Sequence, residues 1–334
     1  MTPQQQHSET HTAPALFPRL QVIEGGKPTV EPANPSSLGR RLSLLCHALP
    51  FLKAFARALP PGLPEMLYTV VLKPRLLRRA VNALILKMLP ETVTTQGVTI
   101  AINPADPVVS GALALGVYEN EQTRLVREKL QPGMRVLDIG ANLGYYAAVF
   151  AQCVGPQGEV IAFEPEPTNF SFLQRTLAVN GFAQARAVHA AVAEAPGETL
   201  LFLSEDNKGD HRLYTARPSQ AAISVPVVSI DTLLSGDNRV DFIKMDVQGA
   251  EGRVLAGMRQ TLACNPQAML LTEFWPEGLR SAGTDPMEFL ATLRNDCGLR
   301  LWETNGAQLH LVTDLHALIA RHPGRRYTNL FCAR

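Results

Sequence analysis

The chain has 334 residues, of which 46% are hydrophobic and 18% charged, with a formal net charge of +1. This length suits one large domain or two small ones, and the near-neutral charge argues against nucleic acid or an acidic partner. Five scattered cysteines without a CxxC pair argue against a disulfide scaffold or zinc site and lead us to expect a reducing cytoplasm.

The N-terminal residues fall into two segments. Residues 1–37 are rich in Pro, Gln, Thr and Ser, so we expect a disordered tail without a secretory signal. Residues 38–90 carry apolar residues at helical spacing and predict a helical extension, in which nine Lys and Arg accompany one acid, Glu65. Two interpretations stay open: a solvated basic face on capping helices, or a peripheral contact with anionic lipid head groups or a charged carrier.

From residue 91 to 334, strand-like and helical runs alternate. The expected strands are Val98–Ile102, Arg135–Ile139, Glu159–Glu164, Ala187–Ala191, Phe242–Asp246, Ala268–Phe274 and Tyr327–Cys332. The expected helices are Glu119–Leu130, Tyr145–Cys153, Asn169–Asn180, Ala250–Ala263 and Pro286–Asp296. This alternation predicts an α/β domain with a mostly parallel sheet, helices on both faces and a ligand crevice at the carboxyl ends of the strands. An antiparallel insertion is expected between Thr199 and Leu233.

A turn rich in small and polar residues follows the first core strand, in VLDIGANLG. Gly140 and Gly144 allow tight backbone angles and close ligand approach because they lack Cβ. The spacing differs from the GxGxxG of dinucleotide-binding folds, and Asp138 would repel a pyrophosphate. Such a turn suits a ligand with an ammonium group, such as S-adenosylmethionine (SAM).

Glu164 lies at the tip of the next predicted strand, where an acid can accept hydrogen bonds from both ribose hydroxyls. Pro165 and Pro167 stiffen the turn that holds it. The turn, this acid and the alternating frame together predict a nucleoside pocket. The alternative is a glycine turn and a surface glutamate that bind nothing.

Seven segments, in order, resemble the FkbM family of SAM-dependent methyltransferases over roughly residues 97–332. They are VVSGALALGVYENE, PGMRVLDIGANLGYYAAVFA, VIAFEPEPTNFSFLQRTLAVNG, VSIDTLL, DFIKMDVQGAEGRVLAGM, LLTEFWPEGLR and YTNLFCA. The resemblance implies the class I SAM-methyltransferase fold, a Rossmann-like, seven-stranded, mostly parallel sheet with a final antiparallel strand. It also implies SAM as methyl donor and an oxygen of a sugar, polyketide or glycolipid-like acceptor.

The resemblance further implies roles for individual residues. Tyr118 and Glu119 would lie near the methionyl end of SAM, above a floor made by Asp138, Gly140, Asn142 and Gly144. Glu164 would hold the ribose. Ala191 and Val192 would line the adenine pocket, where the lack of an acid leaves backbone contacts to the adenine amine.

Three residues are candidates for accepting the proton of an acceptor hydroxyl. Asp246 ends the fourth strand but also suits a helix cap, and Glu251 lies in a first helical turn where the dipole favours any acid. His211 lies in the polar segment NKGDHRLY, where a solvated histidine is equally natural. Glu273 and Trp275 would line the acceptor pocket, or Trp275 would pack in the core. The carboxylates of Asp246, Glu251 and Glu273 could bind Mg²⁺, but their spacing does not specify a metal site and we assign none.

We therefore expect a SAM-dependent methyltransferase that methylates a hydroxyl of a glycan, glycolipid or secondary metabolite, with N-methylation as a variant. Two alternatives remain at this point. One is an NAD(P)-dependent Rossmann oxidoreductase, which the missing GxGxxG disfavours. The other is a partner protein that binds SAM or a nucleotide without catalysis.

Overall fold

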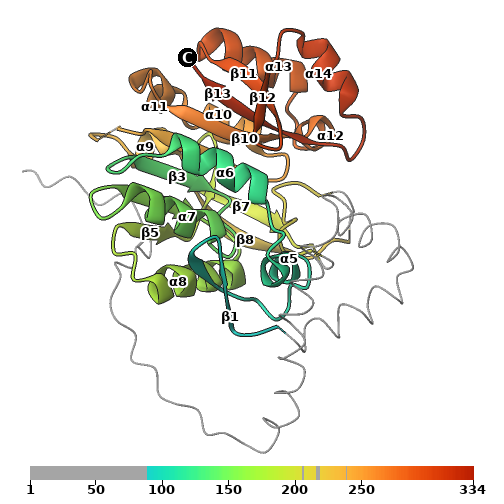
Figure 1. Cartoon of the computed structure of the whole chain (residues 1–334). Helices are drawn as coiled ribbons and strands as arrows, with labels where there is room; N and C mark the ends of the chain where they lie inside the picture. The colour runs from blue at the N-terminus through green and yellow to red at the C-terminus, as the bar shows by residue number, and fades with distance from the viewer. Residues whose placement is uncertain (1–88, 205–206, 216–218, 238) are drawn as a thin grey trace, which may run out of the picture.

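The computed structural model describes residues 89–204, 207–215, 219–237 and 239–334 (Figure 1). The tail predicted for 1–37 and nearly all of the basic helical extension predicted for 38–90 lie outside these ranges. Within the described part of the chain, no helix has the length and apolar character needed to cross a membrane.

The central sheet has eight strands in the order β12-β11-β13-β10-β9-β3-β4-β5. In chain order they are β3 (Arg135–Ile139), β4 (Glu159–Phe163), β5 (Ala185–Val188), β9 (Phe242–Met245), β10 (Met269–Phe274), β11 (Arg300–Asn305), β12 (Gln308–Leu311) and β13 (Thr328–Ala333). The five strands from β10 to β5 are parallel, and β13 is inserted antiparallel between β10 and β11.

Helices cover both faces of this sheet (Figure 1). Alternate residues of β3 enter different cores, because Val136 belongs to one hydrophobic cluster whereas Leu137 and Ile139 belong to the other. The first cluster includes residues of α5 (Val109–Leu115), α6 (Asn120–Lys129), α7 (Tyr145–Val154) and α8 (Pro167–Asn180). The second includes residues of α9 (Ile230–Leu233), α10 (Glu251–Ala256), α11 (Arg259–Cys264), α12 (Pro276–Ser281), α13 (Pro286–Ala291) and α14 (Leu315–Arg321).

The fold is that of class I SAM methyltransferases, as expected, but the strand count differs from seven. Seven strands follow the expected arrangement, and β12 adds an eighth by pairing with β11 as an edge hairpin. The predicted strand at Val98–Ile102 is β2 (Val98–Ala101), which pairs with β1 (Thr92–Thr95) outside the central sheet. The predicted insertion is a three-stranded sheet of β6 (Ala191–Val192), β7 (Gly197–Phe202) and β8 (Ala222–Val228).

The single helix predicted for Ala250–Ala263 is two helices, α10 and α11. Asp231 explains the break, because its carboxylate accepts hydrogen bonds from the backbone N–H groups of Gln260 and Thr261 and so caps α11. The helix predicted for Pro286–Asp296 is α13 followed by a π-helical turn at Thr292–Asp296.

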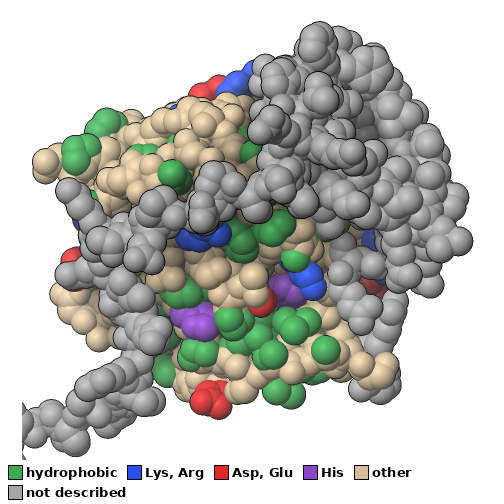
Figure 2. All heavy atoms as spheres, turned by 90° about the horizontal axis from the view of Figure 1, so that it is seen from below, with side chains coloured by type: hydrophobic (Ala, Val, Ile, Leu, Met, Phe, Trp, Pro, Cys, Tyr) green, Lys and Arg blue, Asp and Glu red, His purple; other side chains and the backbone are tan. Residues whose placement is uncertain are grey.

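On the face drawn in Figure 2, hydrophobic and histidine side chains lie close together among few charged ones.

Candidate functional site

Two adjoining pockets lie where the parallel strands end. The larger has a volume of about 350 Å³ and the smaller about 60 Å³. Both are lined by Gly140, after β3, and by Asp246, after β9, which are neighbouring strands at the centre of the sheet. The chain leaves β3 for β4 on one side and returns to β9 on the other, so the pockets occupy the switch point at which open α/β sheets bind ligands.

The turn after β3 is shaped by protein packing as much as by ligand approach. The backbone N–H groups of Gly140 and Ala141 both donate to the carbonyl of Phe163, at 3.0 and 2.9 Å. Gly140 has a φ of +85°, and a Cβ there would overlap the carbonyl oxygen of Asp246. Gly144 lines neither pocket; it precedes α7, and a Cβ there would overlap the side chain of Leu173 in α8.

Backbone strain is concentrated at the larger pocket. Four described residues other than glycine have a positive φ, and three of them line this cavity: Glu119 (41°), Asn142 (52°) and Gln248 (55°). Each such conformation costs on the order of 1–3 kcal/mol, and such residues cluster at active sites and ligand clamps. The predicted residue Glu119 therefore shares this strain with Asn142, and Tyr118 beside it lines the same cavity.

Asp138 and Lys244 face each other across the pocket floor. They are direct partners in the register of β3 and β9. Asp138 is wholly buried. Among the described residues, neither of its carboxylate oxygens has a hydrogen-bond partner of good geometry, but the backbone N–H of Ala147 acts as a weak donor that lowers the pKa of Asp138. Burial raises the pKa of Asp138 to about 6, and the charge of Lys244 only partly opposes this. The carboxylate of Asp138 is thus ready to receive a donor.

Lys244 is a buried cation surrounded by acids. Its ammonium lies 3.3 Å from Asp246 and 4.8 Å from the centre of the Tyr146 ring. Burial acts to lower the pKa of Lys244, but the carboxylates of Asp246, Asp138 and Glu119 outweigh burial and raise it. Lys244 is therefore charged at neutral pH.

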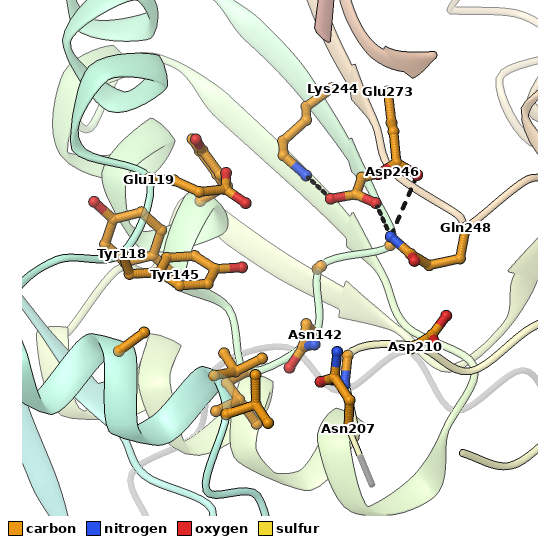
Figure 3. A pocket seen from close by; sticks show the side chains of 18 of the residues that line it. Tyr118, Glu119, Asn142, Tyr145, Asn207, Asp210, Lys244, Asp246, Gln248 and Glu273 are labelled. Atoms are coloured by element: carbon orange, nitrogen blue, oxygen red, sulfur yellow. Dashed lines mark hydrogen bonds and ion pairs between the residues drawn. The ribbon is translucent and has the colours of Figure 1, made fainter. Parts of the chain in front are cut away.

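Gln248 connects two further carboxyl groups of the larger pocket. Its amide nitrogen donates to Asp246 at 2.8 Å and to Glu273 at 3.4 Å (Figure 3). Burial raises the pKa of Glu273 well above its ordinary value, and the charges of Asp246 and Glu251 add to this. Burial thus favours the neutral form of Glu273, while the ion pair with Lys244 and the bond from Gln248 fix the Asp246 carboxylate.

The smaller pocket holds the acid predicted for the ribose. Glu164 accepts hydrogen bonds from the backbone N–H groups of Asn142 and Glu166, both at 2.9 Å. Burial outweighs these bonds and raises the pKa of Glu164 to about 8. Ala191 and Val192 line this pocket, as do the apolar side chains of Phe163, Leu201 and Leu213. The pocket therefore joins a carboxyl group to an apolar slot.

The three candidate proton acceptors lie in three different places. Asp246 lines both pockets. His211 lines the smaller one, where its Nδ1 accepts from the N–H of Ser204 at 2.9 Å and burial lowers its pKa. Glu251 lines neither pocket. Its buried carboxylate accepts from the N–H groups of Val247 and Gly249, and so holds the loop after β9; burial raises its pKa to about 7.

Several lining residues were not identified from the sequence. Lys244 could have been, because it is the one charged residue within the apolar strand FIKM. Asn207, Asp210, Arg212, Arg325, Tyr327 and Asn329 also line the larger pocket. The first three lie in the polar segment NKGDHRLY, from which only His211 was selected as a candidate, and the last three reach the site only through the insertion of β13 beside β10. No group of three or more His, Cys, Asp or Glu that could hold a metal ion occurs in the described ranges.

The chain is similar in sequence to known methyltransferases. Residues 138–301 match the family model described as methyltransferase FkbM domain. Methyltransferase sdnD of Sordaria araneosa is 24% identical over 177 residues, covering 43% of this chain and 68% of that protein. Methyltransferase 1 of Beauveria bassiana (strain ARSEF 2860) is 26% identical over 144 residues, covering 37% of this chain and 57% of that protein.

A solved structure of methyltransferase FkbM from Methylobacillus flagellatus KT is 16% identical, with a TM-score of 0.38. The comparison covers 78% of this chain and 60% of that one. The chain thus spans less than two thirds of this solved structure and of the Beauveria relative.

Proposed function

Because this chain belongs to the FkbM methyltransferases through residues 138–301, we propose that it methylates a hydroxyl oxygen of a glycan, glycolipid or secondary metabolite. It is a SAM-dependent methyltransferase; the acceptor is our proposal. One observation carries it: a fixed carboxylate, Asp246, lies at the wall of a cavity whose floor holds the buried carboxylate of Asp138, which has no hydrogen bond of good geometry among the described residues. The first group can take a proton, and the second can bind a cation.

The residues present fit SAM. A buried carboxylate whose hydrogen-bonding capacity is largely unused is costly, and an ammonium group at Asp138 would satisfy it. Glu119, Asp138 and Asn142 would hold the amino-acid end, while Glu164 would hold the ribose. The apolar slot beside Ala191 and Val192 would take the adenine. When bound, SAM supplies a methyl group made electrophilic by its positively charged sulfur.

The chain's own contribution is positioning and proton transfer. Alignment of two reacting groups within a closed cavity accounts for much of the catalysis of such displacements. Asp246 is placed to take the proton of an acceptor hydroxyl, because Lys244 and Gln248 hold both of its oxygens in fixed positions. His211, in the smaller pocket, and Glu251, beneath the loop, are placed less well for this role.

The proposal is tested by incubating the full-length protein with methyl-labelled SAM and glycan or lipid extracts. We expect label to appear in an extract component as an ether that resists mild base. Calorimetric titration with SAM and with NAD provides a second measurement. Tight binding of NAD without a response to SAM would favour an oxidoreductase, and SAM binding without labelled product in any extract would favour a non-catalytic partner protein.

A further inference from the structure

The outer wall of the larger pocket has a different chemistry from its floor. Three segments that are distant in the sequence form it: residues 207–212, Trp275 after β10, and residues 325–329 at the start of β13. In Figure 3, Asn207 and Asp210 lie across the cavity from Tyr118 and Glu119. The floor (Asp138 and Lys244) and the inner wall (Glu119 and Asp246) hold the groups already assigned to SAM and to proton transfer. The outer wall is therefore left for the acceptor.

Arg212 is held rigidly in this outer wall. Its Nε donates to one oxygen of Asp210 at 2.7 Å, and its Nη2 lies 2.6 Å from the same oxygen in an ion pair. It lies 4.6 Å from the ring centre of Trp275 and 5.6 Å from that of Tyr214. The backbone of Arg212 exchanges two hydrogen bonds with Phe202, at the end of β7. A guanidinium fixed in this way loses little entropy when it binds a ligand.

Trp275 connects Arg212 to the second arginine of the wall. The ring of Trp275 is 8% exposed, and its Nε1 donates to the carbonyl of Gly324 at 2.7 Å. Arg325, the next residue, also lines the cavity. One buried indole therefore contacts Arg212 through its ring and fixes the backbone of Gly324, beside Arg325, through its nitrogen, so Trp275 connects the two segments that carry the arginines of the outer wall.

Charges are sorted between the two walls. The carboxyl groups of Glu119, Asp138 and Asp246 act on Lys244 at the floor and inner wall, where these acids outnumber the single base. At the outer wall two arginines accompany one acid, Asp210, which accepts a hydrogen bond from the Nε of Arg212. An anionic group would be repelled from the inner wall and attracted to the outer one.

We propose that the acceptor is a hydroxyl compound that carries an anionic oxygen group, a phosphate or a carboxylate, bound by Arg212 and Arg325. Arginine forks match the oxygens of both groups, and charge-assisted bonds to them are roughly twice as strong as neutral ones. This inference rests on the proposed function and narrows its acceptor class. When the anion binds at the outer wall, the hydroxyl of the same molecule is free to face Asp246. Gln248 donates to both Asp246 and Glu273, which places Asp246 near the part of the wall that contains Trp275.

The test is calorimetric titration of the full-length protein, saturated with S-adenosylhomocysteine, with three probes: glucose 1-phosphate, glucuronate and glucose. We expect at least one anionic probe to bind about ten-fold or more tightly than glucose. Tighter binding of glucose 1-phosphate identifies a phosphate acceptor, and tighter binding of glucuronate identifies a carboxylate acceptor. Equal affinities for all three, or no binding of either anion, would overturn the proposal.

Variants locate the site. Arg325→Gln should lower the affinity for the preferred anionic probe about ten-fold. Arg326→Gln should leave this affinity unchanged, because Arg326 is the neighbouring exposed arginine and does not line the pocket. Arg212→Gln should also weaken anion binding, but it could do so by misfolding. Arg212→Lys keeps the positive charge and lacks the paired donors of the guanidinium, so a partial loss of anion affinity in this variant would show that binding, and not folding, is affected. Equal losses in the Arg325 and Arg326 variants would refute the assignment.

The two proposals can fail separately. If the anionic probes bind through Arg212 and Arg325 but no extract component is ever methylated, the proposed methyl transfer to oxygen is wrong and the anion site stands. If neutral glycans are methylated as fast as anionic ones, and Arg325→Gln has no effect on either, the methyl transfer stands and the anion site is wrong.

Discussion

Asp138→Asn is expected to make the ligand-free protein more stable at neutral pH. The pKa of Asp138 rises from 3.8 to about 6 in the folded chain, chiefly because burial disfavours the charged carboxylate. An increase of about two pKa units corresponds to ~3 kcal/mol of folding free energy lost to the ionised group at neutral pH. Asparagine has nearly the same shape without the charge, so the substitution removes most of this cost.

The gain has a defined pH dependence. Because the folded-state pKa of Asp138 lies above the unfolded one, the folded protein binds more protons between the two values, and its stability falls as pH rises through them. The advantage of Asp138→Asn should therefore be small at about pH 4, grow up to about pH 6, and stay constant above it. Urea unfolding at about pH 4.5, 6 and 7.5 measures it.

The same substitution should weaken the binding of SAM. Loss of a charge-assisted bond from the SAM ammonium is expected to lower SAM affinity at least about ten-fold, and the wild-type affinity should fall below about pH 6 as Asp138 protonates. Asp241→Asn is the control, at the opposite end of β9. Asp241 accepts from the N–H of Arg135 at 2.7 Å and pairs with Arg239, so its loss should destabilise by about 1 kcal/mol and leave SAM affinity unchanged. Equal destabilisation by both substitutions would refute the account of Asp138.

Three further substitutions test the same site. Gly140→Ala should cost about 1–3 kcal/mol more in urea unfolding than Gly133→Ala, because both have a positive φ but only a Cβ at Gly140 would overlap the carbonyl of Asp246; equal costs would contradict this packing. Glu164→Ala should weaken SAM binding in calorimetry without unfolding the protein, and unchanged affinity would exclude Glu164 as a ribose ligand. Asp246→Asn should lower kcat more than SAM affinity, whereas equal losses in both would indicate a cofactor role for Asp246.

The sequence predicted the frame of the sheet well because its strands carry strong local signals. Arg135–Ile139 is the strand β3 as expected, and the parallel neighbours β4, β9 and β10 agree to within one residue at each end. Buried on both faces, these strands read as continuous apolar runs. The break between α10 and α11 was missed because its cause, the carboxylate of Asp231, is distant in the sequence.

The site likewise contains residues that local sequence signals identified and residues that only tertiary contacts bring together. Asp138, Asn142 and Glu164 could be placed from the sequence because each lies at or just beyond the end of a recognisable strand. Arg212, Trp275 and Arg325 meet only through tertiary contacts, and no spacing along the chain indicates that they share a wall. Glu251 illustrates the converse, since a plausible acid near the site proves to be used in holding the loop after β9.

The most direct test of the account is the structure of this protein with S-adenosylhomocysteine bound. It should show the ligand ammonium within hydrogen-bond distance of Asp138, the ribose hydroxyls at Glu164 and the adenine beside Val192. A crevice that stays empty at saturating ligand, or a ligand that lies elsewhere on the chain, would contradict it.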